Sequence, residues 1–252
     1  MAQADPNKPL DGFLAGVREM EARYADTYAA VSDHVKNPRQ LQLRKGLAAD
    51  FAFRLGSEWE LFQHKWHVVA IAAAPDSFVK AQQAILDTGV RKGNLDHFVQ
   101  LLHGAPLSIP AKPKQGEIEA LLDPRGFNVT FDSCETWATE ASRDLDTRYA
   151  DKVRGIVATA PDACVLDLLK AIRNTLAHGS GGRLARLNQM VKERTSGSKI
   201  GLTGSVNAGL KRDTNQVRDV AVYLHGRATG TARQRVQVLS QRLREIAEQL
   251  RV

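Results

Sequence analysis

Apolar side chains recur every three or four residues along most of this 252-residue chain, and this spacing limits its fold more than any other sequence feature. It is the period of an amphipathic helix, whereas a half-buried β-strand alternates every second residue. The clearest apolar face consists of Val165, Leu168, Leu169, Ile172 and Leu176. It begins near Pro161 and stops at the glycine-rich run 179–182, which predicts a helix with well-marked ends. Because no alternation of strands and helices is visible, we predict an all-α fold.

Other stretches show the same period and predict further helices. They are 13–31, 40–74, 76–103, 184–191 and 236–250. Asn37-Pro38 and Pro75 separate the first three, and the third divides into two pieces near 89–94. Its expected buried residues are Phe78, Ile85, Leu95, Phe98 and Leu101.

The remaining stretches are expected to be less regular. Three prolines between residues 104 and 115 predict a surface loop, and residues 126–131 are interpreted as a short extended piece. Asp132 or Ser133 can cap the helix that follows. The Ser/Gly-rich stretch 195–209 is expected to be mobile or hairpin-like.

The chain is expected to comprise three sequential parts. These are an N-terminal helical extension over 1–42, a helical domain over 43–195, and a connector with basic C-terminal helices that pack on the bundle over 196–252. The longest apolar run, 68–74, is far shorter than the roughly 20 residues that cross a bilayer, so no membrane partner is expected. The first residues lack the apolar core of a signal peptide, which predicts a cytoplasmic location.

The net charge of +7 is unevenly distributed. From Gly181 to the end, 14 Lys/Arg accompany 5 Asp/Glu, a balance of +9, whereas residues 1–180 hold 21 basic and 23 acidic groups, a balance of −2. Lysine and arginine gain affinity for phosphates by releasing counterions, which makes nucleic acid the expected partner of the C-terminal third. A basic face that is merely solvated, or that contacts an acidic protein, stays open as an alternative.

The helix predicted after Pro161 ends in Arg173-Asn174-Thr175-Leu176-Ala177-His178, a group of side chains suited to RNA cleavage. Cleavage needs a proton taken from the 2′-hydroxyl, charge stabilisation at the phosphate, and a proton given to the leaving 5′-oxygen. Histidine titrates near neutral pH and can act as acid or base. The planar fork of arginine binds two phosphate oxygens and stabilises developing charge. This chemistry requires no metal, so no metal or other cofactor is expected.

The pattern Arg-Asn-x-x-x-His at the end of an apolar helix resembles the signature of HEPN-domain proteins, and the flanking sequence is similar to the RiboL-PSP-HEPN branch. The likeness spans roughly residues 43–182 and rests on Trp59-Glu60-Leu61-Phe62, on Gly126-Phe127-Asn128-Val129 leading toward Trp137, and on Leu168-Leu169 with Ile172. It implies a HEPN-type helical bundle with helical extensions and a metal-independent endoribonuclease activity. By the same likeness, the setting is a prokaryotic toxin or abortive-infection effector in antiphage defence, restrained by an antitoxin or a sensor protein.

The resemblance also implies how the site is assembled. Five helical residues separate Arg173 from His178 by about 7.5 Å of rise and roughly 140° of rotation, so one copy does not aim both at one phosphate. The HEPN likeness implies a homodimer whose two motif helices share a cleft, with Arg173 and His178 as catalytic residues and His178 as the general acid at the negative end of the helix. Asn174 shares a helix face with His178 and is expected to orient the imidazole or bind a phosphate oxygen. The likeness places an acidic residue beside the motif, which makes Glu60 the expected partner of Arg173 and Glu58 the alternative.

Other interpretations of these residues stay open. Arg173 and His178 are also cations of the kind that complement a helix C-terminus. Some HEPN domains only bind RNA, so a non-catalytic RNA-binding or interaction module is the alternative function. Glu60, His64 and His67 share one helix face, as metal ligands can, but no second ligand cluster accompanies them. These three residues are instead expected to form a polar face that touches RNA or a partner subunit.

Overall fold

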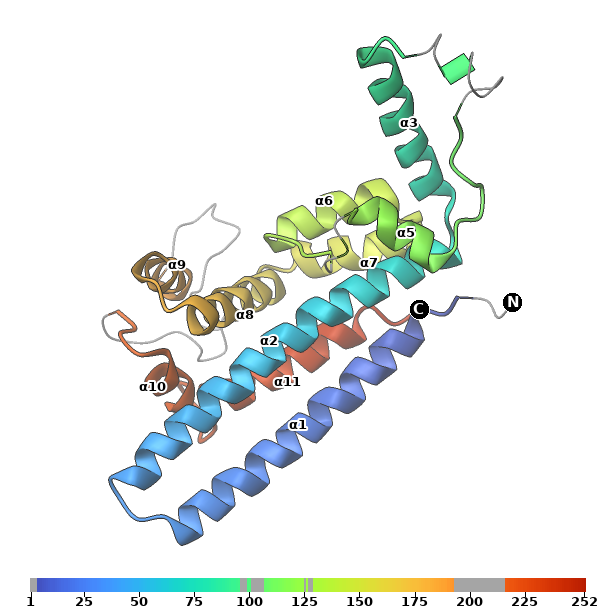
Figure 1. The fold of residues 1–252 in the computed structure, drawn as a ribbon. Helices are drawn as coiled ribbons and strands as arrows, with labels where there is room; N and C mark the ends of the chain where they lie inside the picture. The colour runs from blue at the N-terminus through green and yellow to red at the C-terminus, as the bar shows by residue number, and fades with distance from the viewer. Residues whose placement is uncertain (1–3, 96–98, 101–106, 125, 127–128, 193–215) are drawn as a thin grey trace. The chain divides into compact units, whose positions relative to one another are not determined.

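The structure, a computed structural model, describes residues 4–95, 99–100, 107–124, 126, 129–192 and 216–252. Within these residues it contains ten helices and no strand, apart from an isolated bridge between Arg227 and Gln234, so the predicted all-α fold is confirmed. The helices are α1 (Asn7–His34), α2 (Arg39–Ala73), α3 (Asp76–Lys92), α5 (Gln115–Leu122), α6 (Cys134–Asp144), α7 (Thr147–Ala158), α8 (Ala160–His178), α9 (Gly181–Lys192), α10 (Val220–His225) and α11 (Arg235–Glu248) (Figure 1). No helix in the described part of the chain has the length and apolar character needed to span a membrane.

The chain divides into two compact units, each built from separate stretches of sequence. The central unit comprises Met1–Lys8, Gln63–Arg154 and Val252, and the terminal unit comprises Pro9–Phe62 and Gly155–Arg251. Helix α2 contributes its first part to the terminal unit and its last part to the central unit. The sequential three-part division expected from the sequence stays a prediction.

Aromatic stacking joins α1 to α2 in the terminal unit. The rings of Phe13 and Phe62 stack with centroids 4.6 Å apart, and those of Tyr24 and Phe51 stack at 4.9 Å. Helix α11 lies alongside them and contacts α8, which also packs against α9 and α10 (Figure 1). The buried residues of α11 include the predicted apolar set Val236, Leu239, Leu243 and Ile246. The period of three and four therefore identified the face that this helix buries.

The ends of α8 follow from its sequence. Pro161 occupies its first turn, where the missing N–H would have no intrahelical partner in any case. At the other end, Gly179 adopts the left-handed conformation with a φ of +60°, and its N–H donates to the Thr175 carbonyl at 2.9 Å. Glycine takes this conformation without steric cost, which explains why the helix ends at His178. Its predicted apolar face is buried, with Leu176 half-buried at its end.

Buried aromatic residues form the core of the central unit. Trp137 of α6 is fully buried, and Trp66 of α2 meets the ring of Tyr149 of α7 edge-on at 6.2 Å. Helix α6 begins after Ser133, whose hydroxyl accepts a hydrogen bond from the N–H of Thr136 at 3.2 Å. This confirms the cap expected at Asp132 or Ser133 and assigns it to the serine.

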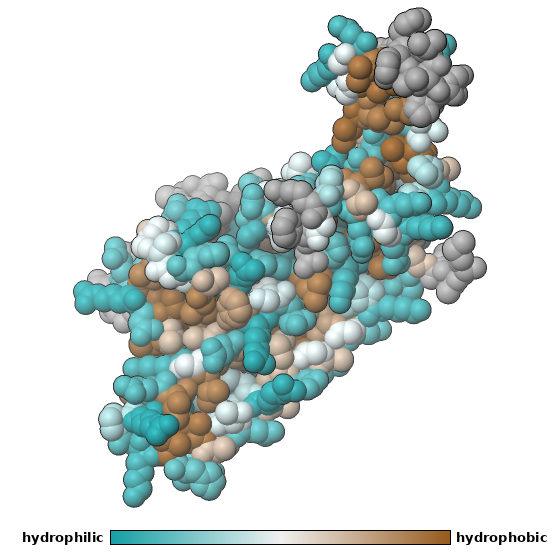
Figure 2. All heavy atoms as spheres, viewed as in Figure 1, coloured by the Kyte–Doolittle hydropathy of each residue, from teal (hydrophilic) through white to brown (hydrophobic). Residues whose placement is uncertain are grey.

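The structure corrects two expected core positions near α3. Phe78 is fully buried, as predicted, but Ile85 and Leu95 are 54% and 48% exposed. Hydrophobic side chains gather along α3 on the surface of this unit (Figure 2). The sequence period identifies an apolar face but not whether another element covers it, which is why the expectation for these two residues was wrong. Phe98 and Leu101 lie outside the described residues.

Short elements account for the other differences from expectation. Helix α9 begins at Gly181 rather than near Leu184, directly after the turn at Gly179. Helices α5, α7 and α10 were not predicted. Helices α5 and α10 have only 8 and 6 residues, which are too few to repeat an apolar period. Residues 129–131 form no strand, and the Ser/Gly-rich stretch 195–209 lies outside the described residues.

Candidate functional site

The last two turns of α8 carry the Arg-Asn-x-x-x-His motif within the terminal unit. Thr175, in the middle of the motif, turns inward and is buried. Its hydroxyl lies 3.2 Å from the carbonyl oxygen of Arg183 at the start of α9. The same hydroxyl lies closer, at 2.7 Å, to the carbonyl oxygen of Ala171 within α8, so it packs the last turn of α8 against the start of α9.

Arg173 is positioned by two oxygen atoms. Its Nη2 lies 3.2 Å from Oε2 of Glu60 on α2, and its Nη1 donates to Oδ1 of Asn174 at 3.0 Å. The side chains of Arg173 and Glu60 are 28% and 17% exposed, so the pair is partly shielded from water but open at one side. The expected pairing therefore forms with Glu60, while Glu58 is exposed.

The guanidinium keeps hydrogen-bonding capacity beyond these two contacts. An arginine side chain has five N–H donors in one plane, and Nε of Arg173 is buried without a partner among the described residues. A carboxylate on one side of the fork fixes the orientation of that plane. The arrangement therefore presents a fixed, planar cation rather than a freely moving one.

Gly56 is a site residue that sequence reasoning missed. A Cβ atom at this position would lie 2.8 Å from the Cβ and 3.1 Å from the Cγ of Arg173, so α2 and α8 approach each other here as closely as glycine allows. Glu60 lies one helical turn further along α2, which brings its carboxylate to the guanidinium. The available signal was a glycine inside a strongly helical segment, where it costs about 1 kcal/mol relative to alanine.

His178 is the exposed final residue of α8. The structure brings Arg173, Asn174 and Glu60 together, but no hydrogen bond joins Asn174 to His178 among the described residues, and the Asn174 carbonyl oxygen accepts from Arg173 instead. Asn174 therefore belongs with the arginine rather than with the imidazole. The imidazole of His178 is accessible to a ligand from solvent.

His64 and His67, in the central unit, do not form the polar surface face expected of them. They are only 8% and 0% exposed, because this part of α2 is covered by other segments of its unit. The Nδ1 atom of His64 accepts from the N–H of Val129 at 3.1 Å, and its Nε2 lies 3.7 Å from Glu119. Burial lowers the pKa of His64 below its ordinary value, although Glu119 opposes this.

The buried His67 faces a carboxylate. Its Nε2 lies 3.9 Å from Oδ2 of Asp144, which accepts two hydrogen bonds from Arg143 at 2.7 and 2.6 Å. Burial raises the pKa of Asp144, but the hydrogen bonds from Arg143 and the nearby imidazole of His67 outweigh it and hold that pKa below its usual range. Among the residues that the structure describes, no group of three His, Cys, Asp or Glu side chains is arranged to hold a metal ion.

Two arginines of the C-terminal helix α11, and one just beyond its end, are engaged in intramolecular ion pairs. Arg242 contacts Asp162 at 2.7 Å, and Arg244 contacts Glu21 at 3.1 Å. The next arginine, Arg251, pairs with Asp11 at 2.9 Å. The remaining arginine of α11, Arg235, donates to the carbonyl of Tyr223 at 3.3 Å and contacts no carboxylate among the described residues. Ion pairs within the bundle therefore neutralise Arg242, Arg244 and Arg251, which the net charge of the sequence segment does not reveal.

Positive charge beside the motif comes instead from α9. Arg183 and Arg186 lie in its first half and are both exposed. The described hydrogen bond of the Arg186 side chain goes to a neutral group, Gln189, at 2.9 Å. These two guanidinium groups follow His178 within eight residues, so a polyanion at the end of α8 would meet cations on the adjoining helix.

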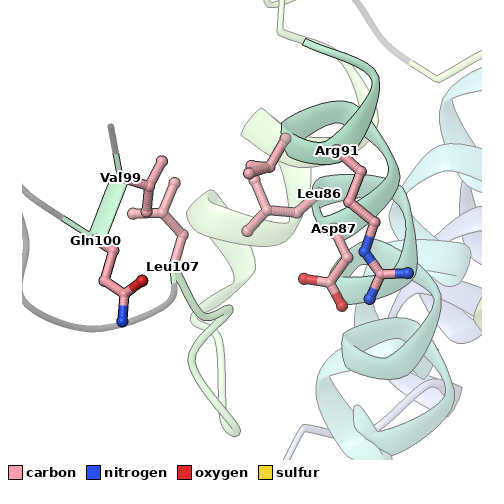
Figure 3. A pocket seen from close by; sticks show the side chains of 7 residues that line it. Leu86, Asp87, Arg91, Val99, Gln100 and Leu107 are labelled. Atoms are coloured by element: carbon pink, nitrogen blue, oxygen red, sulfur yellow. The ribbon is translucent and has the colours of Figure 1, made fainter. Parts of the chain in front are cut away.

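A cavity of about 340 Å³ lies elsewhere, in the central unit. Figure 3 shows Leu86, Asp87 and Arg91 on α3 facing Val99, Gln100 and Leu107 across it. None of the motif residues or their partners lines this cavity. Its mixed lining supplies no group of side chains that resembles a catalytic site.

Comparison of the chain with protein-family models, with curated proteins and with solved structures finds no match. Function must therefore be inferred from the motif and from the side chains that surround it.

Proposed function

We propose that this protein is a metal-independent endoribonuclease of the HEPN type and that Arg173 and His178 carry the reaction. The observation that supports it most directly is the contact between Arg173 and Glu60, which orients a guanidinium on the helix that ends in an exposed histidine. A pair of helix-end cations that only complemented the dipole would need no such carboxylate partner on another helix. The HEPN-like sequence pattern adds independent support.

The chemistry follows from the two side chains. In the proposed reaction the ribose 2′-oxygen attacks phosphorus, the bond from phosphorus to the 5′-oxygen breaks, and a cyclic phosphate and a 5′-hydroxyl remain. Arg173 binds the non-bridging oxygens and stabilises their growing charge. His178 donates a proton to the departing 5′-oxygen, and a second histidine accepts the proton of the 2′-hydroxyl.

The second histidine is supplied by a second copy of the chain in this proposal. Arg173 and His178 of one copy are separated by about 7.5 Å of helix rise and roughly 140° of rotation, so one copy does not aim both at one phosphate. A homodimer with facing motif helices would place two imidazoles and two guanidinium groups around one bond. From the HEPN resemblance we further propose a cytoplasmic location, a role as a toxin or antiphage defence effector, and control by an antitoxin or sensor protein.

The test is an RNA cleavage assay in excess chelator. We expect the wild-type protein to cleave mixed RNA, and His178→Ala and Arg173→Ala to lose at least about 100-fold in rate, as removal of a general acid or an electrostatic stabiliser does. His34→Ala is the matched control, because His34 is also the exposed last residue of a helix. Cleavage that requires a metal would contradict the mechanism, and RNA binding without cleavage would favour a non-catalytic RNA-binding module.

A further inference from the structure

A groove in the terminal unit, away from the motif in sequence, has a volume of about 540 Å³. Helix α1 contributes Tyr24 and Tyr28 to it, α10 contributes its last residue, His225, and the segment between α10 and α11 contributes Arg227 and Gln234. This volume falls within the range of pockets that hold small ligands of nucleotide size. Its lining combines aromatic rings, amides and a cation, and includes no Asp or Glu.

Planar groups are arranged next to one another at this groove. The Tyr28 hydroxyl lies 3.2 Å from Nε2 of His225, and the two ring centroids are 6.0 Å apart with planes inclined by 26°. The guanidinium of Arg44 lies 4.8 Å from the centroid of the Tyr28 ring. Burial lowers the pKa of His225, and the nearby Arg44 and Lys45 lower it further. Flat aromatic groups of this kind are surfaces on which nucleobases stack.

The groove also carries a cation that the fold does not neutralise, and a second cation lies on the same segment outside the lining. Arg227 is exposed and makes no ion pair with a described residue. Arg233, on the same segment, bonds only neutral groups among its described contacts, the side chain of Gln241 and the carbonyl of Gln237. Arg242 and Arg244 of α11 are paired with carboxylates, whereas Arg227, beside the tyrosines of α1, makes no ion pair with a described residue.

We propose that this groove binds a nucleotide of single-stranded RNA, with the base against the rings of Tyr28 and His225 and the phosphate at Arg227. The inference rests on the proposed function, because the bound strand would be the ribonuclease's own substrate held at a second point. A single strand fits better than a duplex, since its bases are free to leave their stack and contact protein rings. An acidic protein partner would use the cations but would have no need of the aromatic faces.

The experiment measures binding separately from cleavage. A fluorescein-labelled single strand of about ten nucleotides, the size that one binding surface covers, carries 2′-O-methyl groups that prevent attack by the 2′-oxygen. Fluorescence anisotropy gives its Kd for the wild-type protein, for Arg227→Gln and for Arg18→Gln. Arg18 is the matched control, an exposed arginine on α1 that does not line the groove. Two further variants, His225→Ala and His225→Phe, remove and retain a ring, and circular dichroism verifies that each is folded.

We expect Arg227→Gln to weaken binding about three- to tenfold and to reduce the salt dependence by about one phosphate contact, while Arg18→Gln changes Kd less than about twofold. We expect His225→Ala to weaken binding and His225→Phe to restore it. Equal Kd values for wild type, Arg227→Gln and His225→Ala would overturn the proposal, as would a glutamate-rich peptide that competes as well as RNA. If the wild-type protein does not cleave RNA in the earlier assay but the variants still differ in Kd, the ribonuclease proposal is rejected while RNA binding at the groove stands.

Discussion

Gly56 lies directly against the stem of Arg173, so that a Cβ atom on this glycine would be 2.8 Å from the Cβ of the arginine. This close approach of α2 and α8 allows Glu60, one turn further on, to reach the guanidinium at 3.2 Å. The geometry of the candidate site therefore depends on a residue that has no side chain. Helix propensity alone would make alanine stabilising at this position, but the contact with Arg173 should make it destabilising.

Gly56→Ala should destabilise the protein by about 1–3 kcal/mol, because the added methyl group has no room against Arg173. Gly46→Ala is the matched control on the same helix, since a Cβ there meets nothing within 4 Å. We expect it to stabilise the protein by about 0.5–1 kcal/mol through helix propensity. Urea unfolding of both variants measures the difference, and stabilisation by Gly56→Ala would show that the two helices are not in contact.

Glu60→Gln should slow RNA cleavage by about 10- to 100-fold, because the guanidinium would lose the carboxylate that orients it. The free energy of unfolding should fall by less than about 1 kcal/mol, as is usual for an ion pair open to water. Glu58→Gln, an exposed change on the same turn, is expected to leave the rate unchanged.

A double-mutant comparison separates positioning from general damage. If Glu60 acts through Arg173, then Glu60→Gln should have no further effect on the residual rate of Arg173→Ala. If Glu60→Gln lowers the rate by the same factor in the wild-type protein and in Arg173→Ala, the carboxylate acts independently of the arginine.

Arginines of the C-terminal region should separate into structural and RNA-binding groups. Arg242→Gln leaves the buried Asp162 without its cation and should cost about 1–3 kcal/mol of stability, with no change in RNA affinity. Arg186→Gln, on the exposed face of α9, should weaken RNA binding a few-fold and change stability by less than about 0.5 kcal/mol. Denaturant unfolding and anisotropy on both variants test this division, and weaker RNA binding by folded Arg242→Gln would contradict it.

Stability should decrease as the pH falls below about 6.5, the ordinary pKa of histidine. Burial lowers the pKa of His64 in the folded protein, so on acidification the unfolded chain takes up a proton before the native state does. His225 acts in the same direction.

His64→Gln removes one titrating group while its amide oxygen can still accept from the N–H of Val129. It should make the free energy of unfolding less dependent on pH between about 7.5 and 5.5, whereas His34→Gln, at an exposed position, should not. Urea titrations at both pH values measure the slopes, and an unchanged slope in His64→Gln would assign the effect elsewhere.

Local pattern predicted the long helices and the end of α8, because both depend on neighbours in sequence, although α1 begins at Asn7, before its apolar period does. The face of α8 from Val165 to Ile172 and the end of that helix before Gly179 needed only periodicity and a glycine. Exposure was less predictable. Ile85 belongs to an apolar stripe but is open to solvent, while the polar His67 is completely buried.

The sequence by itself determined that this chain is helical, where its long helices end, and that an arginine, an asparagine and a histidine stand at the end of one of them. Tertiary structure alone decided that Glu60 rather than Glu58 pairs with Arg173, and that Asp162, rather than a ligand, neutralises Arg242. These contacts join residues far apart along the chain, and their partners depend on how closely two helices approach. That distance is set by packing, as at Gly56, and no local periodicity encodes it.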